Sequence, residues 1–492
     1  MSLFTINNKT NSWKKPVIGF LCLTSSLAFS QSNSSPLALE TLLKTVNKSY
    51  PKIIAARLQV MKAQGEYLRA LGAFDPSLKA NTRSQPEGGY INNYANNELS
   101  IPTFANGLRL FAGYRVGRGD YPIYYQNYLT NSGGEYRAGV ALPLLKDFFI
   151  DKQRTALMTQ TEMIVLSIHD VEATKLSVYH ETIKAYWQWV GSGLQLQTLK
   201  QLLSLAKKRR DAIVKQAESG DLPRLAVVEN QQIIMQRQQS VNQGRMLFEQ
   251  AAVSLSIYYR DQKGRPLTPS IQQLPKAVLI KGPREINNSS HIRTGLIHHP
   301  AIQKLDRYYQ IIKLKQKLAK NDLLPNLNAM AYTSKQYGTG ADPKLLPQAA
   351  MIGIHFKFPI YQREAKGNII STTSELKQIE TEKKLLHEQL NNQFSNLLIA
   401  LRMYRQQINL LNKELDFAKQ VGAGEAKKFY EGDSTLFLVN QREQTTTQVQ
   451  LNLINAKMAL QETSSLVRFF VSTHFRDGSN SVNTHLDFHS HF

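Results

Sequence analysis

Apolar residues recur at alternating steps of four and three along two long stretches, the pattern of coiled-coil helices. The clearer stretch runs from Leu390 to Ala418 and resumes at Leu436, after Gly432-Asp433-Ser434-Thr435. Glycine adopts positive φ, and Asp, Ser and Thr cap helices, so this break predicts a helical hairpin with its tip near residue 432. The alternative is one continuous helix that tolerates the glycine. A matching helical pattern over 144–218 ends at Ser219-Gly220-Asp221-Leu222-Pro223, which predicts a second tip near residue 220.

Two pairs of prolines indicate that the chain is duplicated. Pro51 and Pro76 are 25 residues apart, and so are Pro300 and Pro325, which gives both pairs an offset of 249 residues. The apolar pattern before the second proline of each pair predicts helices over 36–74 and 292–324. Two copies of one supersecondary unit explain this repetition most simply.

After each second proline the apolar period changes to two. This alternation predicts strands within 77–143 and 326–358 that have one apolar and one polar face. In a soluble protein the apolar face would cover a core, whereas in an exported protein it can face lipid while the polar face lines a lumen. The alternation places five cationic or titratable residues on the polar face: Lys79, Arg83, Arg137, His355 and Lys357.

The first copy differs from the second over residues 86–134. Asn106-Gly107, the strongest short hairpin signal, lies between the candidate strands Leu99–Phe104 and Leu108–Val116. This hairpin either enlarges the sheet or forms an outer loop. Eight tyrosines lie between Tyr90 and Tyr136, which is typical of a membrane-interface belt or of a tyrosine-rich surface loop.

The flanking composition predicts the remaining domains. Lysines, an apolar run over 17–27 and Ala28-Phe29-Ser30 predict a signal peptide over residues 1–30. The first repeat then covers 31–260, a linker rich in Pro and Gly covers 261–290, the second repeat covers 291–471, and a flexible polar tail covers 472–492. The single cysteine, Cys22, lies in the predicted signal peptide, so the mature chain needs no disulfide.

The formal net charge of +23 raises nucleic acid or an anionic surface as partners. However, the basic residues are dispersed singly along helices, and an export signal argues against nucleic acid. No phosphate loop, nucleophile elbow or zinc helix is present, so we predict neither an enzyme nor a cofactor or metal site. His298-His299 precedes Pro300 at a predicted helix start, where capping is favoured over a metal pair.

The order of elements resembles the TolC-like outer-membrane efflux channels, also called outer membrane factors. The resemblance covers essentially the whole mature chain. Its motifs are the early-helix prolines Pro51 and Pro300, the helix-to-strand prolines Pro76 and Pro325, and the tip glycines Gly220 and Gly432. It implies an α+β, mainly α, homotrimer in the outer membrane of a diderm bacterium. Three chains would together build a β-barrel and a long periplasmic helical tunnel, with twelve strands if each chain supplies four.

The resemblance also implies partners and sites. The tips would dock a periplasmic adaptor that connects to an inner-membrane transporter, through Gly220, Asp221, Leu222, Gly432, Asp433 and Ser434. Family members often place aspartates six and nine residues after the second tip glycine. Leu438 and Gln441 stand there in this chain, so we expect a periplasmic gate without an acidic ring.

Two function classes remain open from the sequence. The first is a passive conduit for efflux or type I secretion, whose cationic lumen would favour anions. The same cations could instead lie in outer loops near anionic lipid headgroups. The second class is an exported coiled-coil scaffold or adhesin without a pore, which would need no duplicated strand pairs.

Overall fold

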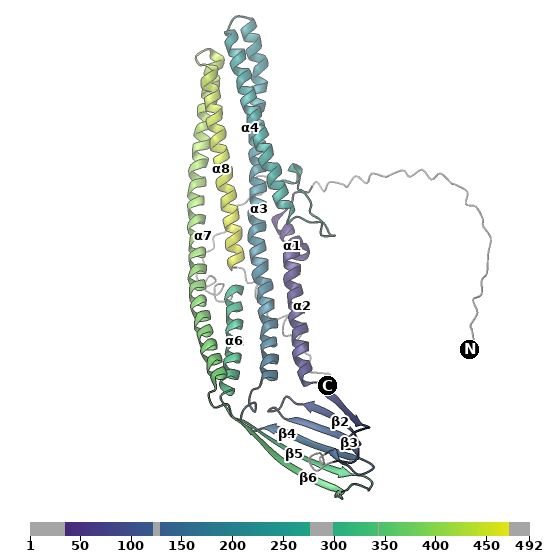
Figure 1. Cartoon of the computed structure of the whole chain (residues 1–492). Helices are drawn as coiled ribbons and strands as arrows, with labels where there is room; N and C mark the ends of the chain where they lie inside the picture. The colour runs from purple at the N-terminus through teal and green to yellow at the C-terminus, as the bar shows by residue number, and fades with distance from the viewer. Residues whose placement is uncertain (1–34, 122–127, 276–298, 343, 472–492) are drawn as a thin grey trace, which may run out of the picture. The chain divides into compact units, whose positions relative to one another are not determined.

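The computed structural model describes residues 35–121, 128–275, 299–342 and 344–471 (Figure 1). The predicted signal peptide and C-terminal tail, and His298, lie outside the described residues. Contacts separate Met1–Ser35 from Pro36–Phe492, and the second unit carries all the elements that follow.

Two long helical hairpins dominate the second unit. The first consists of α3 (Lys152–Glu218) and α4 (Arg224–Ser256), and the second of α7 (Arg363–Glu431) and α8 (Leu436–Val471). Three shorter helices, α1 (Leu39–Ser49), α2 (Pro51–Leu71) and α6 (Pro300–Asn321), accompany them, with 3-10 turns η1 (Gly72–Phe74) and η3 (Ile271–Gln273). Helix α2 packs on α3, and α6 packs on both α3 and α7. Both predicted hairpins are therefore present, in place of one continuous helix.

The prolines explain where the shorter helices begin. The single helix expected over 36–74 is wrong, because α1 ends at Ser49 and Tyr50 is extended, with ψ 123°. Pro51 cannot donate an N–H and its ring excludes the preceding turn, so it can only start a new helix. Pro300 likewise begins α6, and the side chain of His299 caps that helix.

The long helix of the first repeat begins later than predicted. Residues 144–150 are not helical, because the Leu144 N–H donates to the Leu327 carbonyl at 2.7 Å and ties this segment to the second repeat. Helix α3 starts only at Lys152, where the Asp151 carboxylate accepts the Arg154 N–H at 2.7 Å. This N-cap supplies a partner for one of the amides that a helix start leaves unpaired.

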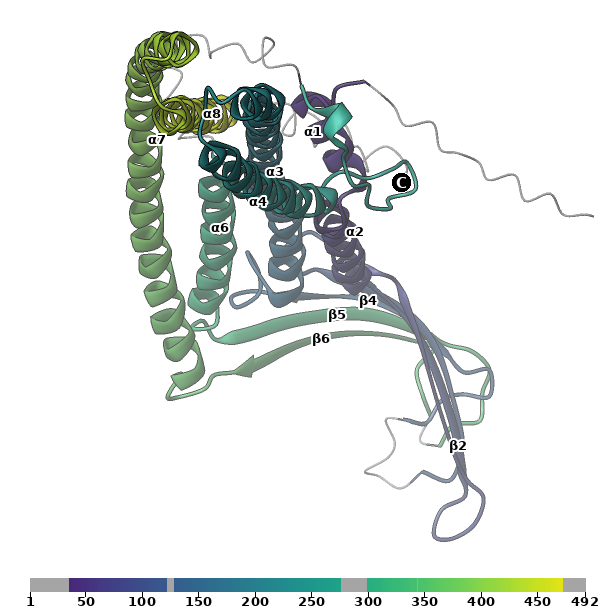
Figure 2. The same cartoon turned by 90° about the horizontal axis from the view of Figure 1, so that it is seen from above.

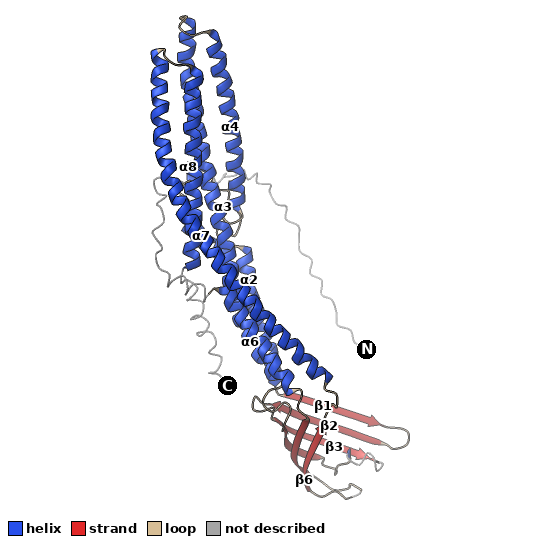
Figure 3. Ribbon diagram, turned by 90° about the vertical axis from the view of Figure 1, so that its left-hand side faces the viewer, coloured by secondary structure: helices blue, strands red, loops and turns tan. Residues whose placement is uncertain are grey.

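Six antiparallel strands form one sheet in the order of the chain (Figure 2). They are β1 (Ser77–Gln85), β2 (Asn92–Pro102), β3 (Arg109–Gly119), β4 (Glu135–Pro143), β5 (Asn326–Gln336) and β6 (Gln348–Lys357). Strand β4 of the first repeat pairs with β5 of the second. Strands β1 and β6 are the two edges. Figure 3 shows that helices and strands occupy separate parts of this unit.

The hairpin predicted at Asn106-Gly107 adds β2 and β3 to this sheet. Both turn residues have positive φ, 49° and 69°. A Cβ on Gly107 would lie 2.7 Å from Pro143 Cγ, so this turn accepts only glycine. Each chain therefore supplies six strands rather than four, and the hairpin does not form an outer loop.

The cap of α6 predicts a pH-dependent stability. His299 Nδ1 accepts the Ala301 N–H at 3.3 Å, and burial lowers the pKa of His299 to about 4. In the unfolded chain the pKa of this histidine is ~6.5, so the unfolded chain takes up the imidazole proton at a higher pH than the folded chain does. The stability that neutral His299 contributes is therefore complete above pH ~6.5 and is lost as the pH falls toward 4. We expect the free energy of unfolding, measured by thermal unfolding in detergent, to fall by roughly 2–3 kcal/mol between pH 6.5 and 4.

The matched variant is His299→Asn, because asparagine caps a helix without titrating. It should unfold with a clearly smaller dependence on pH between 6.5 and 4. An identical pH dependence in the two proteins would show that His299 does not carry the effect.

Candidate functional site

The strand register divides the sheet into two faces. Lys79, Glu98 and Arg137 lie in one cross-strand row, because Lys79 pairs with Glu98, Glu98 with Gly113, and Gly113 with Arg137. Strand alternation extends this face to all five predicted residues, which are Lys79, Arg83, Arg137, His355 and Lys357. We call it the polar face. The structure thus brings together residues that lie up to 278 positions apart in the sequence.

The opposite face is apolar and exposed. Its residues include Leu78, Ile352 and Ile354, which are 73%, 83% and 71% exposed. Near the end of β4 that lies away from the helices, Tyr136 packs against Tyr114 and Tyr337, with ring centroids 4.7 and 5.4 Å apart. Large apolar side chains exposed on one sheet face indicate contact with lipid or with protein.

Two carboxylates on the polar face pair with arginines. Arg137 Nη2 donates to Glu98 Oε2 at 2.8 Å and to Asn96 Oδ1 at 3.0 Å. Arg115 forms an ion pair with Glu135. Arg137, predicted as a bare lumen cation, is therefore neutralised. The strands carry six cations on this face, Lys79, Arg83, Arg109, Arg115, Arg137 and Lys357, against these two carboxylates.

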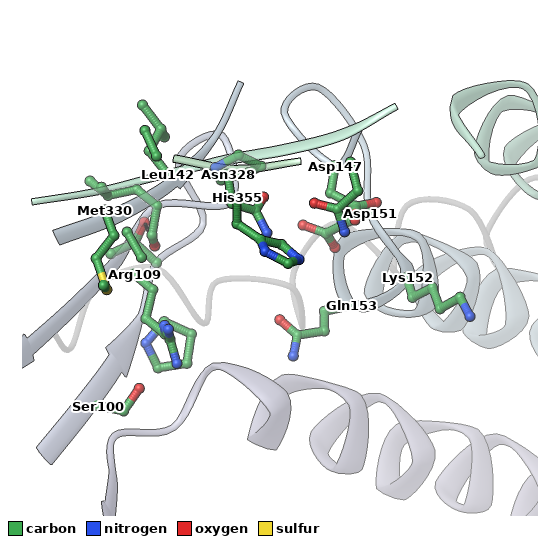
Figure 4. Close-up of a pocket in the computed structure, with 18 of the residues that line it drawn as sticks. Ser100, Arg109, Leu142, Asp147, Asp151, Lys152, Gln153, Asn328, Met330 and His355 are labelled. Atoms are coloured by element: carbon green, nitrogen blue, oxygen red, sulfur yellow. Dashed lines mark hydrogen bonds between the residues drawn. The ribbon is translucent and has the colours of Figure 1, made fainter. Parts of the chain in front are cut away.

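A cavity of about 1090 Å³ lies where the polar face meets the connection between β4 and α3 (Figure 4). The His355 ring points into this space, with Arg109 and Ser100 on one side and Asp147, Asp151 and Lys152 on the other. Lys79 also lines the cavity. Arg83 instead lines a second cavity of about 330 Å³ with Tyr94, Tyr121 and Tyr128.

The connections between strands and long helices are held by two non-glycine residues with positive φ. Asp147 has φ 70°. The Asp147 N–H donates to Asn321 Oδ1 at 3.2 Å, and the Asp147 carboxylate accepts from Asn321 Nδ2 at 3.1 Å. Gln362 has φ 51° and donates to the Leu323 carbonyl at 2.7 Å. Asp147 and Gln362 are thus both hydrogen-bonded to residues at the end of α6, and these bonds offset the conformational cost of a positive φ.

The hairpin tips have the same geometry in both repeats. Gly220 and Gly432 have φ 86° and 87°. The Asp221 N–H donates to Gln216 O and the Asp433 N–H to Lys428 O, both at 2.9 Å, which is the six-to-one bond of a Schellman cap. The two glycines and two aspartates are exposed, whereas Leu222 and Ser434 are half-buried. An apolar cluster joins the tips: Ile213, Ala226, Phe429, Leu436 and Val439.

A buried polar network links the two hairpins near the tips. Glu443 of α8 pairs with Arg209 of α3 and, at 2.9 Å, with Arg237 of α4. Asn440 Oδ1 accepts from both arginines, at 3.0 and 3.1 Å. Burial lowers the pKa of Arg237, and the bond to Glu443 opposes this shift. The predicted gate residues lie beside this network, with Leu438 half-buried and Gln441 exposed.

By sequence alone, the chain matches no protein-family model and no curated protein. Solved structures do match. CusC is 12% identical and aligns with 88% of this chain and 92% of its own, with a TM-score of 0.64. The CmeC outer-membrane channel of Campylobacter jejuni is 13% identical over 96% and 97%, with a TM-score of 0.63. The open-state MtrE outer-membrane channel of Neisseria gonorrhoeae is 13% identical over 88% of each chain, with a TM-score of 0.63.

The chain has the fold of the TolC-like outer-membrane channels. The resemblance inferred from the duplicated prolines and tips is thereby confirmed for the fold. Within the described residues, no helix combines the length and hydropathy that a membrane span requires. In the same part of the chain, no three His, Cys, Asp or Glu side chains are grouped as a metal site.

The network between the hairpins predicts a specific loss of stability. Glu443→Gln would leave Arg237 and Arg209 buried with no carboxylate, and breaking a buried ion pair costs roughly 3–5 kcal/mol. We expect lower unfolding free energy in urea and faster hydrogen exchange at both tips. The network joins α3, α4 and α8, so both tips should respond together.

Glu431→Gln is the matched control. Glu431 is 53% exposed and its oxygen lies 3.7 Å from Lys427 Nζ, within one helix. Such surface pairs contribute at most about 0.5 kcal/mol. Equal effects of the two substitutions would contradict the role assigned to Glu443.

Proposed function

We propose that this protein is the outer-membrane channel of a tripartite efflux or type I secretion system. It acts as a passive homotrimeric conduit from the periplasm to the exterior. The observation that carries this proposal is the sheet, with an exposed apolar face, a charged polar face and two unpaired edges. The fold shared with solved outer-membrane channels supports the same conclusion.

The unpaired edges require other copies of the chain. In hydrocarbon, the backbone groups of an open edge have no hydrogen-bond partner, so a lipid-facing sheet must close into a barrel. Strand β1 of one copy and β6 of the next, antiparallel to it, would close the sheet through a head-to-tail ring. With three copies, as the resemblance implies, the barrel has eighteen strands. Barrels of this size enclose an aqueous channel.

Exposed apolar rows on two helices support the same ring. Helix α2, which leads into β1, exposes Ile54, Leu58, Met61 and Leu68 along one side. Helix α7, which follows β6, exposes Ile399, Met403, Leu410, Phe417 and Val421 at heptad spacing. The α2 row lies close to β1 in the sequence, and the α7 row lies farther along the helix that follows β6. They therefore suit contacts between neighbouring copies.

The dimensions suit a membrane and a periplasm. Strands of 9 to 11 residues extend about 30 Å, close to the height of the apolar band of a membrane barrel. Tyr114, Tyr136 and Tyr337 would form the outer interfacial belt, and Phe149, Ile360 and Tyr361 the inner one. The 67-residue α3 extends about 100 Å at 1.5 Å per residue, which gives the large periplasmic portion.

The tips would form the docking end for a periplasmic adaptor, which recruits an inner-membrane transporter. The exposed tip residues are Gly220, Asp221, Gly432 and Asp433. A Cβ built on either glycine would have no heavy atom of the described residues within 4 Å. The shared six-to-one bond and positive φ place a Gly-Asp pair in the same way at both tips. Leu438 and Gln441 would form the adjacent gate, held in place by the Glu443 network.

The direct test is planar-bilayer recording of the purified mature protein, together with its mass in detergent. We expect trimer-sized particles with small, mostly closed openings. A monomeric protein that neither inserts nor conducts would overturn the channel and favour an exported helical scaffold.

The charge on the polar face predicts that the channel prefers anions. Six cations per chain face two carboxylates, and a ring of excess cations lowers the barrier for anions. In a salt gradient, the reversal potential should therefore have the sign of an anion-selective pore. Glu98→Gln removes the carboxylate that pairs with Arg137, so this variant should shift the reversal potential further toward anion selectivity. A cation-selective reversal potential, or a shift toward cations in Glu98→Gln, would contradict the assignment of this face to the lumen.

A further inference from the structure

The segment Tyr128–Gly134 leads into β4, and its first part, Tyr128–Asn131, folds back over the polar face. The Tyr128 ring packs edge-on against Tyr94, with centroids 4.8 Å apart, and Tyr94 belongs to the cross-strand row of Arg83 and Gly117. Leu129, Thr130 and Asn131 are only 8%, 4% and 7% exposed. This segment is therefore packed against the sheet, although it is a connection at the outer ends of the strands.

Gly117 forms the seat of this segment. A Cβ built on Gly117 would lie 1.9 Å from the Tyr128 carbonyl oxygen and 3.0 Å from the Tyr121 hydroxyl. Thr130 Oγ1 accepts the Gly117 N–H at 3.0 Å and lies 3.3 Å from the Gly117 carbonyl. Gly117 does not have a positive φ, so its backbone would accept a side chain. The glycine is required only for the close approach of Tyr128.

Hydrogen bonds secure the other end of the segment to the second repeat and to two side chains of the apolar face. The Tyr114 hydroxyl donates to the Gly133 carbonyl at 3.1 Å, and Arg118 Nη2 donates to the Ser132 carbonyl at 2.9 Å. The Gly133 N–H donates to the Tyr337 carbonyl at 2.8 Å, and the Asn131 N–H to Gln336 Oε1 at 3.1 Å. The Ser132 N–H donates to the Thr339 carbonyl at 3.2 Å. The segment is thus held both by β3 of the first repeat and by the residues after β5 of the second.

We infer that Tyr128–Asn131 is an inward-folded constriction that sets the size limit of the outer mouth. This inference rests on the proposed channel, because only there does the polar face line a pore. An eighteen-stranded barrel without such a segment would be open to solutes as wide as its lumen. Three inward-folded segments narrow it at one level while the wall keeps all its strands.

The surface beside the constriction is polar and aromatic. Asn81, Arg83, Asn96, Tyr94 and Tyr121 line the adjacent cavity with Tyr128. The Tyr121 hydroxyl donates to the Asn93 carbonyl at 2.8 Å, and burial raises the pKa of Tyr121. Hydrated solutes would therefore pass amides and phenols at this level, and large solutes would be excluded by size.

The test compares two glycines of the polar face. Gly117→Val should displace Tyr128, because the new side chain occupies the position of its carbonyl oxygen. Gly353→Val is the matched control, since Gly353 lies on the same face with no heavy atom within 4 Å of its Cβ position. Valine favours strands at both positions. We would record trimeric channels with polyethylene glycols of graded size added to the outer side only.

We expect Gly117→Val to shift the exclusion threshold to larger polymers, and Gly353→Val to leave it at the wild-type size. A second readout reports the segment itself. In a Cys22→Ser background, a Leu129→Cys thiol should be protected from maleimide, and adding Gly117→Val should make it reactive.

Each outcome is decisive. A reactive thiol with an unchanged polymer threshold would overturn the constriction. A thiol that stays protected after Gly117→Val is added would overturn Gly117 as the seat of the segment. If wild type and control variant both fail to conduct, the proposed channel itself is wrong, which is a different failure from an unchanged threshold.

Discussion

A sheet that exposes an apolar face cannot leave its edges open, and the rest of this structure depends on that constraint. Within the described residues, β1 and β6 have a hydrogen-bonded neighbour on one side only. In water such edges invite aggregation, and in lipid their amides would have no partners. In the proposed channel, closure by further copies would satisfy the edges and give the apolar face a place in the bilayer. The polar face would then line a lumen, and the helices would extend from the barrel into the periplasm.

The duplication makes this arrangement economical. Each repeat delivers its strands and its long helix in the same order, and β4 and β5 join the repeats into one continuous wall. Asp147 and Gln362 fasten the start of each long helix to the end of α6, so the connection between barrel and helices is held from both sides. Near the opposite end, Glu443 ties α8 to both helices of the first hairpin. The long helices are thus held near both of their ends, while the glycine and aspartate of each tip stay exposed.

Local signals predicted the elements that short-range chemistry determines. Gly220 and Gly432 predicted the tips because a Schellman cap needs positive φ, and Asn106-Gly107 predicted a hairpin for the same reason. Strand alternation predicted the polar face, since it depends only on neighbouring residues. The break at Tyr50 was also readable from Pro51, but the apolar pattern on both sides obscured it.

Long-range contacts determined what the sequence did not predict. The late start of α3 depends on the hydrogen bond from the Leu144 N–H to the Leu327 carbonyl, which no local pattern shows. Glu98 was missed because residues 86–134 were treated as an insert, although continued alternation would have placed it beside Lys79. The Glu443 network joins three helices at positions without a motif. The seat at Gly117 depends on Tyr128, and only folding brings the two together.

Disulfide cross-linking of the two edge strands tests whether neighbouring copies of the chain close the sheet. Asn81→Cys on β1 would be combined, in a Cys22→Ser background, with a second cysteine at Ala349, Met351 or Gly353 on β6. All four positions lie on the polar face, and Ile352→Cys on the apolar face is the control. The account predicts inter-chain disulfides for at least one polar-face pair, none for the control, and a ladder of products that ends at three chains. No inter-chain product, or a ladder that ends at another number, would contradict the closed three-chain barrel.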